Sequence, residues 1–236
     1  TQSIASKFAS DKKDLIFAIS TPSAQAAFNA TKDIPILITA VSDPVAAGLV
    51  KTLEKPGTNV SGTSDFVSVD KGLELLKIFA PKAKTIGVMY NTSEVNSKVQ
   101  VDALKEYASK NGFKVVEKGI TTSNEVNQGI SSLVGKIDVL YVPTDNLVAS
   151  SMPIVSKIAT ENKIPVIAAE SGPVEKGALA CQGINYEKLG YKTGEMAVKI
   201  LNGESVSDMP VATSDDTDII VNEDILKALG MEKPSN

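Results

Sequence analysis

The chain has no histidine, no tryptophan and no arginine, and it has one cysteine in 236 residues. Histidine is the commonest general base and the commonest metal ligand, so its absence argues against an ordinary acid–base enzyme and against a metal centre. The single cysteine, Cys181, excludes an intrachain disulfide and a cysteine-based metal site, and we expect it to be a small buried residue. The basic residues are all lysines, the net charge is −4 and there is no basic stripe, which argues against nucleic-acid binding.

Several other features are missing. No apolar run approaches the roughly 20 residues of a membrane-spanning helix, and no signal peptide is recognisable. There is no Walker loop, no dinucleotide-binding GxGxxG fingerprint and no nucleophile–base arrangement. These absences weigh against an enzyme, with an enzyme that uses only carboxylates as the open alternative, and we predict no enzyme activity, no cofactor and no metal. The first residues, TQSIASKF, include no initiator methionine, so we expect a chain that is processed, trimmed or incomplete.

What the chain does contain is a repeated pattern. Residues 14–48 hold an apolar strand-like run, the polar tripeptide TPS, a helical run, and a second apolar run that follows an Ile-Pro step. Residues 138–179 repeat this order, with TDN as the tripeptide. Strand, polar loop, helix and strand form the βαβ unit of a parallel sheet, and ligands bind beyond the carboxyl ends of such strands. Two copies in one chain predict an α/β protein of two doubly wound lobes.

The two copies differ in what precedes them. They align with an offset of 124 residues (138 − 14), so residues 84–124 have no counterpart before Thr1. We therefore expect the first lobe to lack about 40 residues, including the strand beside residues 15–19. An apolar strand that is unpaired on one side can pair with another chain. We expect a separate fragment, a neighbouring molecule or a rearranged segment to lie against it; a bare edge would mean that the alignment misplaces the strand.

Several segments together resemble a known family. They are DLIFAISTPSAQAA, IPILITAVSDPVAAGLV, PGTNVSG, TIGVMYN with its following helix, and NYEKLGYKTGEMAVKILNGE. The combination resembles the type I periplasmic-binding proteins of ABC importers, and it is most similar to the Gram-positive lipoproteins that bind tryptophan and other aromatic amino acids. The similarity runs from Thr1 to about Leu229. The lipobox cysteine and the first βαβ unit of the family are not found in this sequence.

This resemblance implies a fold, a function and a location. The fold would be two Rossmann-like lobes, joined by crossing strands, that close over a small ligand. The lobes would comprise residues 1–63 with about 189–215, and residues 64–188 with about 216–236. The protein would be the extracellular solute-binding component of an ABC importer, with an ABC permease as its partner. It would be a cell-surface lipoprotein of a Gram-positive bacterium, or periplasmic, and would contact the membrane only through a lipid anchor that this sequence does not contain.

The polar loops after the first lobe's strands supply candidate ligand-binding residues: Thr21, Ser23 and Ser42. The N-terminus of a helix favours an anion, and hydroxyl groups there can hold one. Because the chain has no arginine, hydroxyls, amides or lysine would have to hold a ligand carboxylate. The alternative is that these hydroxyls only cap helices. Asp65, at the first crossover, would either contact the ligand or brace the hinge.

In the second lobe the matching loops carry Thr144, Asp145, Asn146 and Glu170. Acidic side chains opposite a hydroxyl-rich loop would form a slot for an α-amino acid, with its ammonium group on the acidic side. Related amino-acid binders in this fold have similar binding slots. The alternative is that Asp145 caps its own helix and Glu170 is solvated.

Tyr90 and Asn91, at the end of the second lobe's first strand, are further candidates for ligand contact. Phe66, Tyr141 and Tyr186 could wall a pocket for the ligand's side chain, although aromatic residues more often belong to the core. We favour an aromatic or large apolar amino acid as the ligand. One alternative is a sugar or nucleoside, although sugar sites in this fold are usually richer in Trp, Arg and Asn. Another is the effector-binding domain of a transcription regulator, which would normally follow a helix-turn-helix segment.

Overall fold

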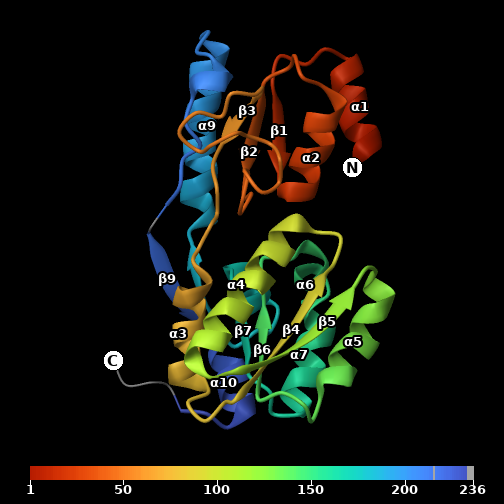
Figure 1. The fold of residues 1–236 in the computed structure, drawn as a ribbon, viewed down its shortest axis with the longest axis vertical. Coiled ribbons are helices and arrows are strands. Elements are labelled where there is room, and N and C mark those ends of the chain that lie inside the picture. Colours follow the sequence, from red (N-terminus) through yellow and green to blue (C-terminus); the bar gives the residue numbers. More distant parts are fainter. Residues whose placement is uncertain (215, 233–236) are drawn as a thin grey trace. The chain divides into compact units, whose positions relative to one another are not determined.

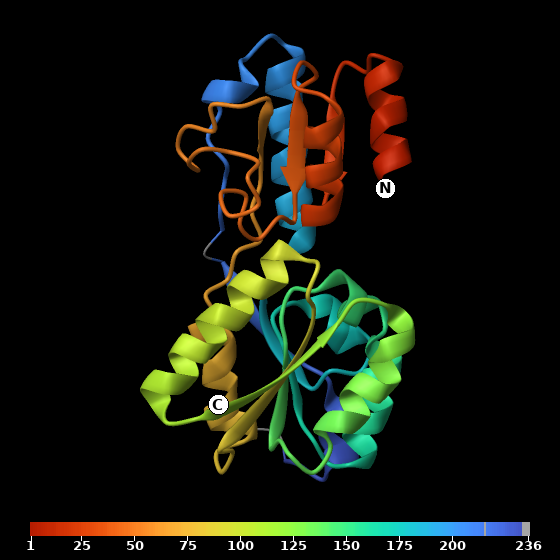
Figure 2. The same cartoon turned by 45° about the vertical axis from the view of Figure 1, so that its right-hand side comes forward.

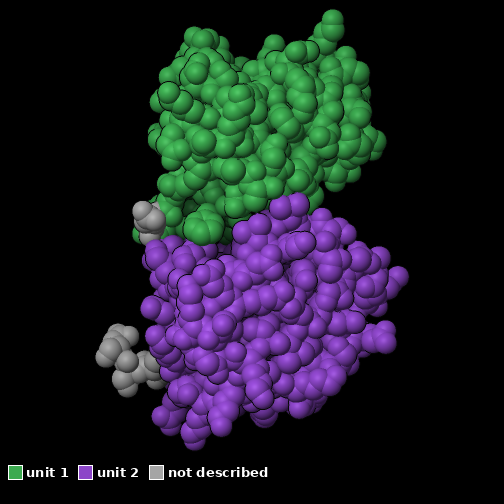
Figure 3. Space-filling view, viewed as in Figure 1, with its two compact units in different colours: residues 1–66, 184–216 green, residues 67–183, 217–236 purple. Residues whose placement is uncertain are grey.

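The computed structural model describes residues 1–214 and 216–232, and the chain forms two compact units. Unit 1 consists of residues 1–66 and 184–216, and unit 2 of residues 67–183 and 217–236 (Figure 3). These boundaries differ from the lobe boundaries proposed above by three, five and one residues. The chain therefore passes from one unit to the other three times, and each unit contains segments that are far apart in the sequence.

Unit 1 contains a small parallel sheet. Its elements are α1 (Gln2–Ser10), β1 (Ile16–Ile19), α2 (Thr21–Ala30), β2 (Ile36–Thr39), β3 (Val60–Gly62), α9 (Tyr186–Leu201) and the short 3-10 helix η2 (Val206–Asp208). The strands lie in the order β1-β2-β3, with α2 and α9 on opposite faces (Figures 1 and 2). Alternate side chains on a strand point to opposite faces. Ile16 and Ala18 therefore pack against Ala24 and Ala27 of α2, while Leu37 packs against α9.

Unit 2 contains a six-stranded sheet in the order β5-β4-β6-β7-β8-β9. Strands β4 to β8 are parallel, and helices cover both faces of the sheet (Figure 1). The predicted α/β fold with parallel sheets is thus confirmed. Cys181 is buried, as predicted, and Tyr141 belongs to the core. The elements are α3 (Val69–Phe79), β4 (Thr85–Asn91), α4 (Val95–Asn111), β5 (Lys114–Ile120), η1 (Ser123–Glu125), α5 (Val126–Leu133), β6 (Val139–Val142), α6 (Asn146–Ser150), α7 (Met152–Glu161), β7 (Val166–Ala168), α8 (Ser171–Glu175), β8 (Ala180–Ile184), β9 (Thr217–Val221) and α10 (Glu223–Leu229).

The sequence repeat is visible in the hydrogen bonds of the two sheets. The Ile16 amide of β1 donates to the carbonyl that precedes β2, at 3.0 Å. The equivalent amide of β6, that of Leu140, donates to the carbonyl that precedes β7, at 2.9 Å. Each strand also follows a helix, α1 in unit 1 and α5 in unit 2. The strands that the sequence alignment matched, β1 and β6, therefore pair in the same way with the strand that follows each of them.

Among the described residues, no rearranged segment of this chain pairs with the free side of β1, and pairing with a separate fragment or a neighbouring molecule stays a prediction. In unit 2, β4 pairs with the far side of β6, but β1 is an edge strand and no described strand lies on its far side. Phe17 is consequently 50% exposed, whereas Tyr141, the residue aligned with it on β6, is 1% exposed. By the criterion stated above, a bare edge would mean that the alignment misplaces the strand. The matching hydrogen bonds of β1 and β6 support the alignment instead. On its paired side β1 bonds to β2, and it packs against α2.

Candidate functional site

In unit 1, the candidate residues lie where β1 and β2 end. Thr21 begins α2 and is buried, and Ser42 follows β2 and is also buried. Ser23, one turn into α2, is half-buried and lines a groove with α1 and β1. Ser20, the residue that precedes α2, makes no capping hydrogen bond through its side chain. The N-cap position of α2 is thus held by Ser20, while Thr21 and Ser23 lie within the helix.

The backbone is strained at both of these strand ends. Ser20 has φ 72° and ψ 158°, and Ala40 has φ 54°. Residues with a side chain rarely adopt positive φ, and such conformations cost about 1–3 kcal/mol each. They persist where the surrounding structure holds them, often at binding sites. Both strained residues lie at the carboxyl edge of the unit 1 sheet, the edge at which ligands bind to parallel sheets.

The segment after β3 is tied to this edge by side-chain hydrogen bonds. The Ser64 hydroxyl donates to the Ser42 carbonyl at 3.0 Å. The Tyr186 hydroxyl, from the first residue of α9, donates to Oδ2 of Asp65 at 2.9 Å. Asp65 is only 5% exposed, and its Oδ1 is buried without a hydrogen-bond partner among the described residues. Asp65 therefore lies beside Ser42 with one carboxylate oxygen unsatisfied.

Burial raises the pKa of the Asp65 carboxyl above its ordinary value of 3.8, and the hydroxyls of Tyr186 and Ser42 oppose that shift. A raised pKa means that the folded chain binds this proton more tightly than the unfolded chain. The free energy of unfolding should therefore fall as the pH rises from 3.8 through the raised pKa. We expect the substitution Asp65→Asn to abolish this contribution. Urea unfolding of both proteins between about pH 4 and 7 measures it, and an identical pH dependence in the two would contradict the expectation.

In unit 2, the structure places Asp145 in a structural role. Asp145 is fully buried, and its carboxylate accepts hydrogen bonds from the Val148 amide at 2.9 Å, the Asn91 amide at 2.6 Å and the Ser97 hydroxyl at 2.7 Å. It thus caps α6, as the alternative reading of the sequence had it, and also fixes the end of β4. Burial raises its pKa, and the two amides oppose the shift. Ligand contact by Asp145 remains a prediction.

Sequence reasoning missed a buried polar network around this carboxylate. Glu94, which precedes α4, accepts hydrogen bonds from the side-chain amides of Asn91, Asn96 and Asn146. Asn96 also donates to the Thr144 carbonyl at 2.6 Å, and its own Oδ1 is buried without a partner among the described residues. The available signal was the spacing of Asn96, Ser97 and Gln100, three buried polar residues on one face of a helix.

The remaining candidates of unit 2 are placed as follows. The Gln100 side chain donates to the Thr144 hydroxyl and accepts from the Thr144 backbone amide. The Asn146 backbone amide donates to the Glu94 carboxylate. Tyr90 donates to Glu117 at 3.3 Å. Glu170 precedes α8 without capping it through its side chain. The structure therefore brings Asn91, Thr144, Asp145 and Asn146 together in one hydrogen-bond network.

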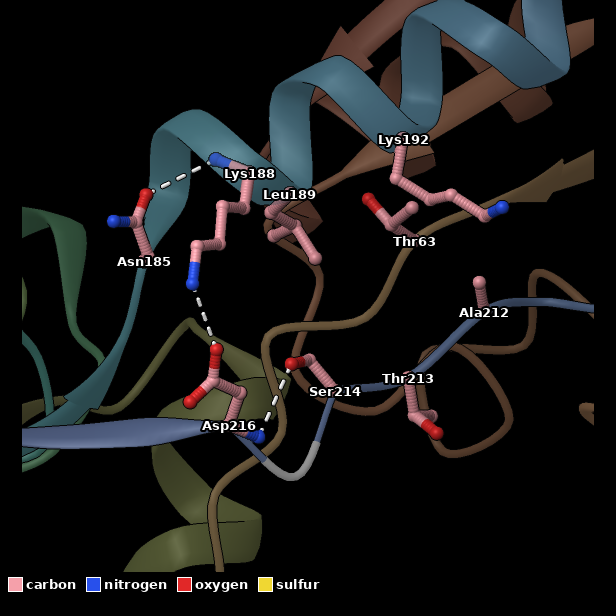
Figure 4. A pocket seen from close by; sticks show the side chains of 9 residues that line it. All are labelled: Thr63, Asn185, Lys188, Leu189, Lys192, Ala212, Thr213, Ser214 and Asp216. Carbon is pink, nitrogen blue, oxygen red and sulfur yellow. Dashed lines mark hydrogen bonds and ion pairs between the residues drawn. The ribbon is translucent and has the colours of Figure 1, made fainter.

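The aromatic candidates have three different environments. Tyr141 is core, Phe66 is 50% exposed, and Tyr186 holds Asp65. A separate hollow of about 190 Å³ lies in unit 1 beside the first turns of α9 (Figure 4). Its lysines are used in ion pairs, Lys188 with Asp216 at 2.9 Å and Lys192 with Glu195 at 3.3 Å. Among the described residues that line this hollow, both lysines are therefore already paired.

No group of three or more acidic, cysteine or histidine side chains in residues 1–214 and 216–232 is placed to hold a metal ion. In the same residues, no helix combines the length and apolar character that crossing a membrane requires.

Comparisons with known proteins give a consistent result. A family model described as ABC transporter substrate binding protein matches residues 1–236. A Clostridioides difficile protein described as tyrosine-binding protein is 74% identical over 235 residues, which are 100% of this chain and 68% of that protein. A Streptococcus pneumoniae ABC domain solved in complex with L-Trp is 37% identical, with a TM-score of 0.93, over 98% of this chain and 79% of that one. A conserved domain protein from Vibrio cholerae has a TM-score of 0.94 at 38% identity, over 99% of this chain and 80% of that one.

Proposed function

Because the chain belongs to the family of ABC transporter substrate-binding proteins, we propose that it binds an aromatic amino acid, tyrosine or tryptophan, and delivers it to an ABC permease. The observation that carries the choice of ligand is the 74% identity to a tyrosine-binding protein. The structure related at 37% identity, solved with L-Trp, supports the same ligand class. The protein is a binding protein and not an enzyme, in agreement with its family.

The family indicates the location of the protein in general terms. Solute-binding proteins of this kind are extracellular. As a finer proposal, the protein is a lipoprotein on the surface of a Gram-positive bacterium, held there by a lipid anchor. Its contact with the permease is likewise part of the proposal.

For the ligand carboxylate we propose the carboxyl edge of the unit 1 sheet. Thr21 and Ser42 lie there, and α2 directs its N-terminal amides toward the same edge. Backbone amides and hydroxyls at a helix N-terminus bind anions. The strained backbone at Ser20 and Ala40 supports this assignment. Ser23, Asn91, Thr144, Asn146, Glu170 and Tyr90 remain proposed contacts for other parts of the ligand.

Calorimetry on the purified chain tests the proposal. We expect L-tyrosine or L-tryptophan to bind with a Kd of about 1 μM or tighter, about −8 kcal/mol or beyond. L-leucine, D-ribose and adenosine serve as matched small solutes of other classes. Heat with ribose or adenosine, and none with any amino acid, would overturn the proposal.

A further inference from the structure

We propose that Asp65 supplies the negative charge that binds the α-ammonium group of the ligand, a role that the sequence alone assigned to the acidic residues of the second lobe. The inference rests on the proposed function in one respect, namely that the ligand is an amino acid. It assigns the recognition of the ligand's amine to unit 1, the unit that also contains Thr21 and Ser42.

The first step is the unsatisfied charge. Asp65 is 95% buried, its Oδ1 has no hydrogen-bond partner among the described residues, and none of the ion pairs formed by the described residues includes it. The Ser42 hydroxyl is near enough to favour the charged carboxylate but makes no hydrogen bond with Oδ1. A buried carboxylate without a cation is unfavourable, and a bound cation removes the penalty.

The second step is the position of Asp65. Its neighbour Ser64 is hydrogen-bonded to the Ser42 carbonyl, at the end of the segment that follows β2. Asp65 therefore belongs to the carboxyl edge of the unit 1 sheet, where α2 presents its N-terminus. An α-amino acid carries its ammonium and carboxylate groups on one carbon. A carboxylate and a helix N-terminus at the same edge of one sheet can provide a partner for each.

The third step is the contrast with Asp145. Both carboxylates are buried, but Asp145 already accepts hydrogen bonds from two amides and a hydroxyl, so its charge is compensated within unit 2. Asp65 accepts a hydrogen bond from the Tyr186 hydroxyl at 2.9 Å, and this bond orients the carboxylate. The other oxygen, Oδ1, accepts no hydrogen bond from the described residues, so it can accept one from an ammonium group.

The test removes the amine from the ligand and the charge from the protein, singly and together. The ligands are L-tyrosine and 3-(4-hydroxyphenyl)propanoate, with L-tryptophan and indole-3-propanoate as a second pair. In the wild-type protein we expect loss of the amine to weaken binding by about 100-fold or more. In Asp65→Asn we expect that difference to shrink to about tenfold or less.

Two control variants separate charge from structure. Asp138→Asn changes a carboxylate of unit 2 that accepts hydrogen bonds from the backbone amides of Lys84 and Thr85, away from the candidate residues, and should keep the full discrimination between the paired ligands. Tyr186→Phe removes the orienting hydrogen bond and keeps the charge, so it should reduce the discrimination only in part. If Asp65→Asn discriminates as strongly as the wild type, Asp65 is a structural brace and the inference is overturned.

A second measurement on the wild-type protein covers the case in which Asp65→Asn does not fold. An ammonium group beside Asp65 would lower its raised pKa, so binding at about pH 4.5 should release protons. Calorimetry in two buffers of different ionisation enthalpy measures this release, and binding without it would overturn the inference. If the wild-type protein binds no amino acid at all, the proposed function is overturned. That result differs from unchanged discrimination in Asp65→Asn, which overturns only the inference about Asp65.

Discussion

Replacing Gly62 with alanine is expected to destabilise unit 1 by about 3–5 kcal/mol. Gly62 ends β3 with φ +140°, a conformation that residues with a side chain rarely adopt. An added Cβ would lie 2.0 Å from the Ile38 carbonyl oxygen and 2.6 Å from the Ile38 amide nitrogen. These are backbone atoms of the neighbouring strand, so the contact is relieved only if β2 and β3 separate.

Gly48→Ala is the matched control for this substitution. Gly48 also lies in unit 1 with positive φ, +72°, but an added Cβ there meets nothing within 4 Å. We expect it to cost about 1 kcal/mol, from the backbone conformation alone. Urea unfolding combined with hydrogen exchange of residues 36–39 measures both effects. Equal losses in the two variants would show that the approach of β2 to β3 is not what requires glycine.

Replacing Asp145 with alanine should destabilise unit 2 by about 3–5 kcal/mol, because it leaves the buried amides of Asn91 and Val148 and the Ser97 hydroxyl without their acceptor. The matched control is Asn185→Ala, which removes an exposed helix cap with one accepted bond, from the Lys188 amide at 3.0 Å. It should cost about 1 kcal/mol. Thermal unfolding with and without L-tyrosine measures both variants. A fully stable Asp145→Ala that has lost ligand binding would instead assign this carboxylate to the ligand.

Sequence reasoning located the strands and the functional edge because both are local patterns. The apolar runs before TPS and TDN became β1 and β6, and the loops after them contain the site candidates. The repeat predicted the parallel topology, because a strand, a helix and a second strand in that order form a βαβ unit. In such a unit the two strands are parallel and the crossover is right-handed.

The partners of the polar side chains were out of reach of the sequence. Asp145 is bonded to Asn91 and Ser97, which are 54 and 48 residues away, and Tyr186 reaches Asp65 across 121 residues. Whether a carboxylate caps a helix or keeps an unsatisfied oxygen depends on such distant partners. The backbone strain at Ser20 and Ala40 could not be predicted either, because positive φ is expected from sequence mainly at glycine and neither residue is a glycine.

The place of α9 in unit 1 has a consequence for how the chain folds. This helix covers Leu37 on β2, yet it follows β3 by about 120 residues, nearly all of which belong to unit 2. Loop closure over that distance is slow and must precede the packing that repays it. Unit 2, whose residues 67–183 are contiguous in the sequence, can assemble earlier. During synthesis one face of the unit 1 sheet thus stays open until residues 186–201 have emerged.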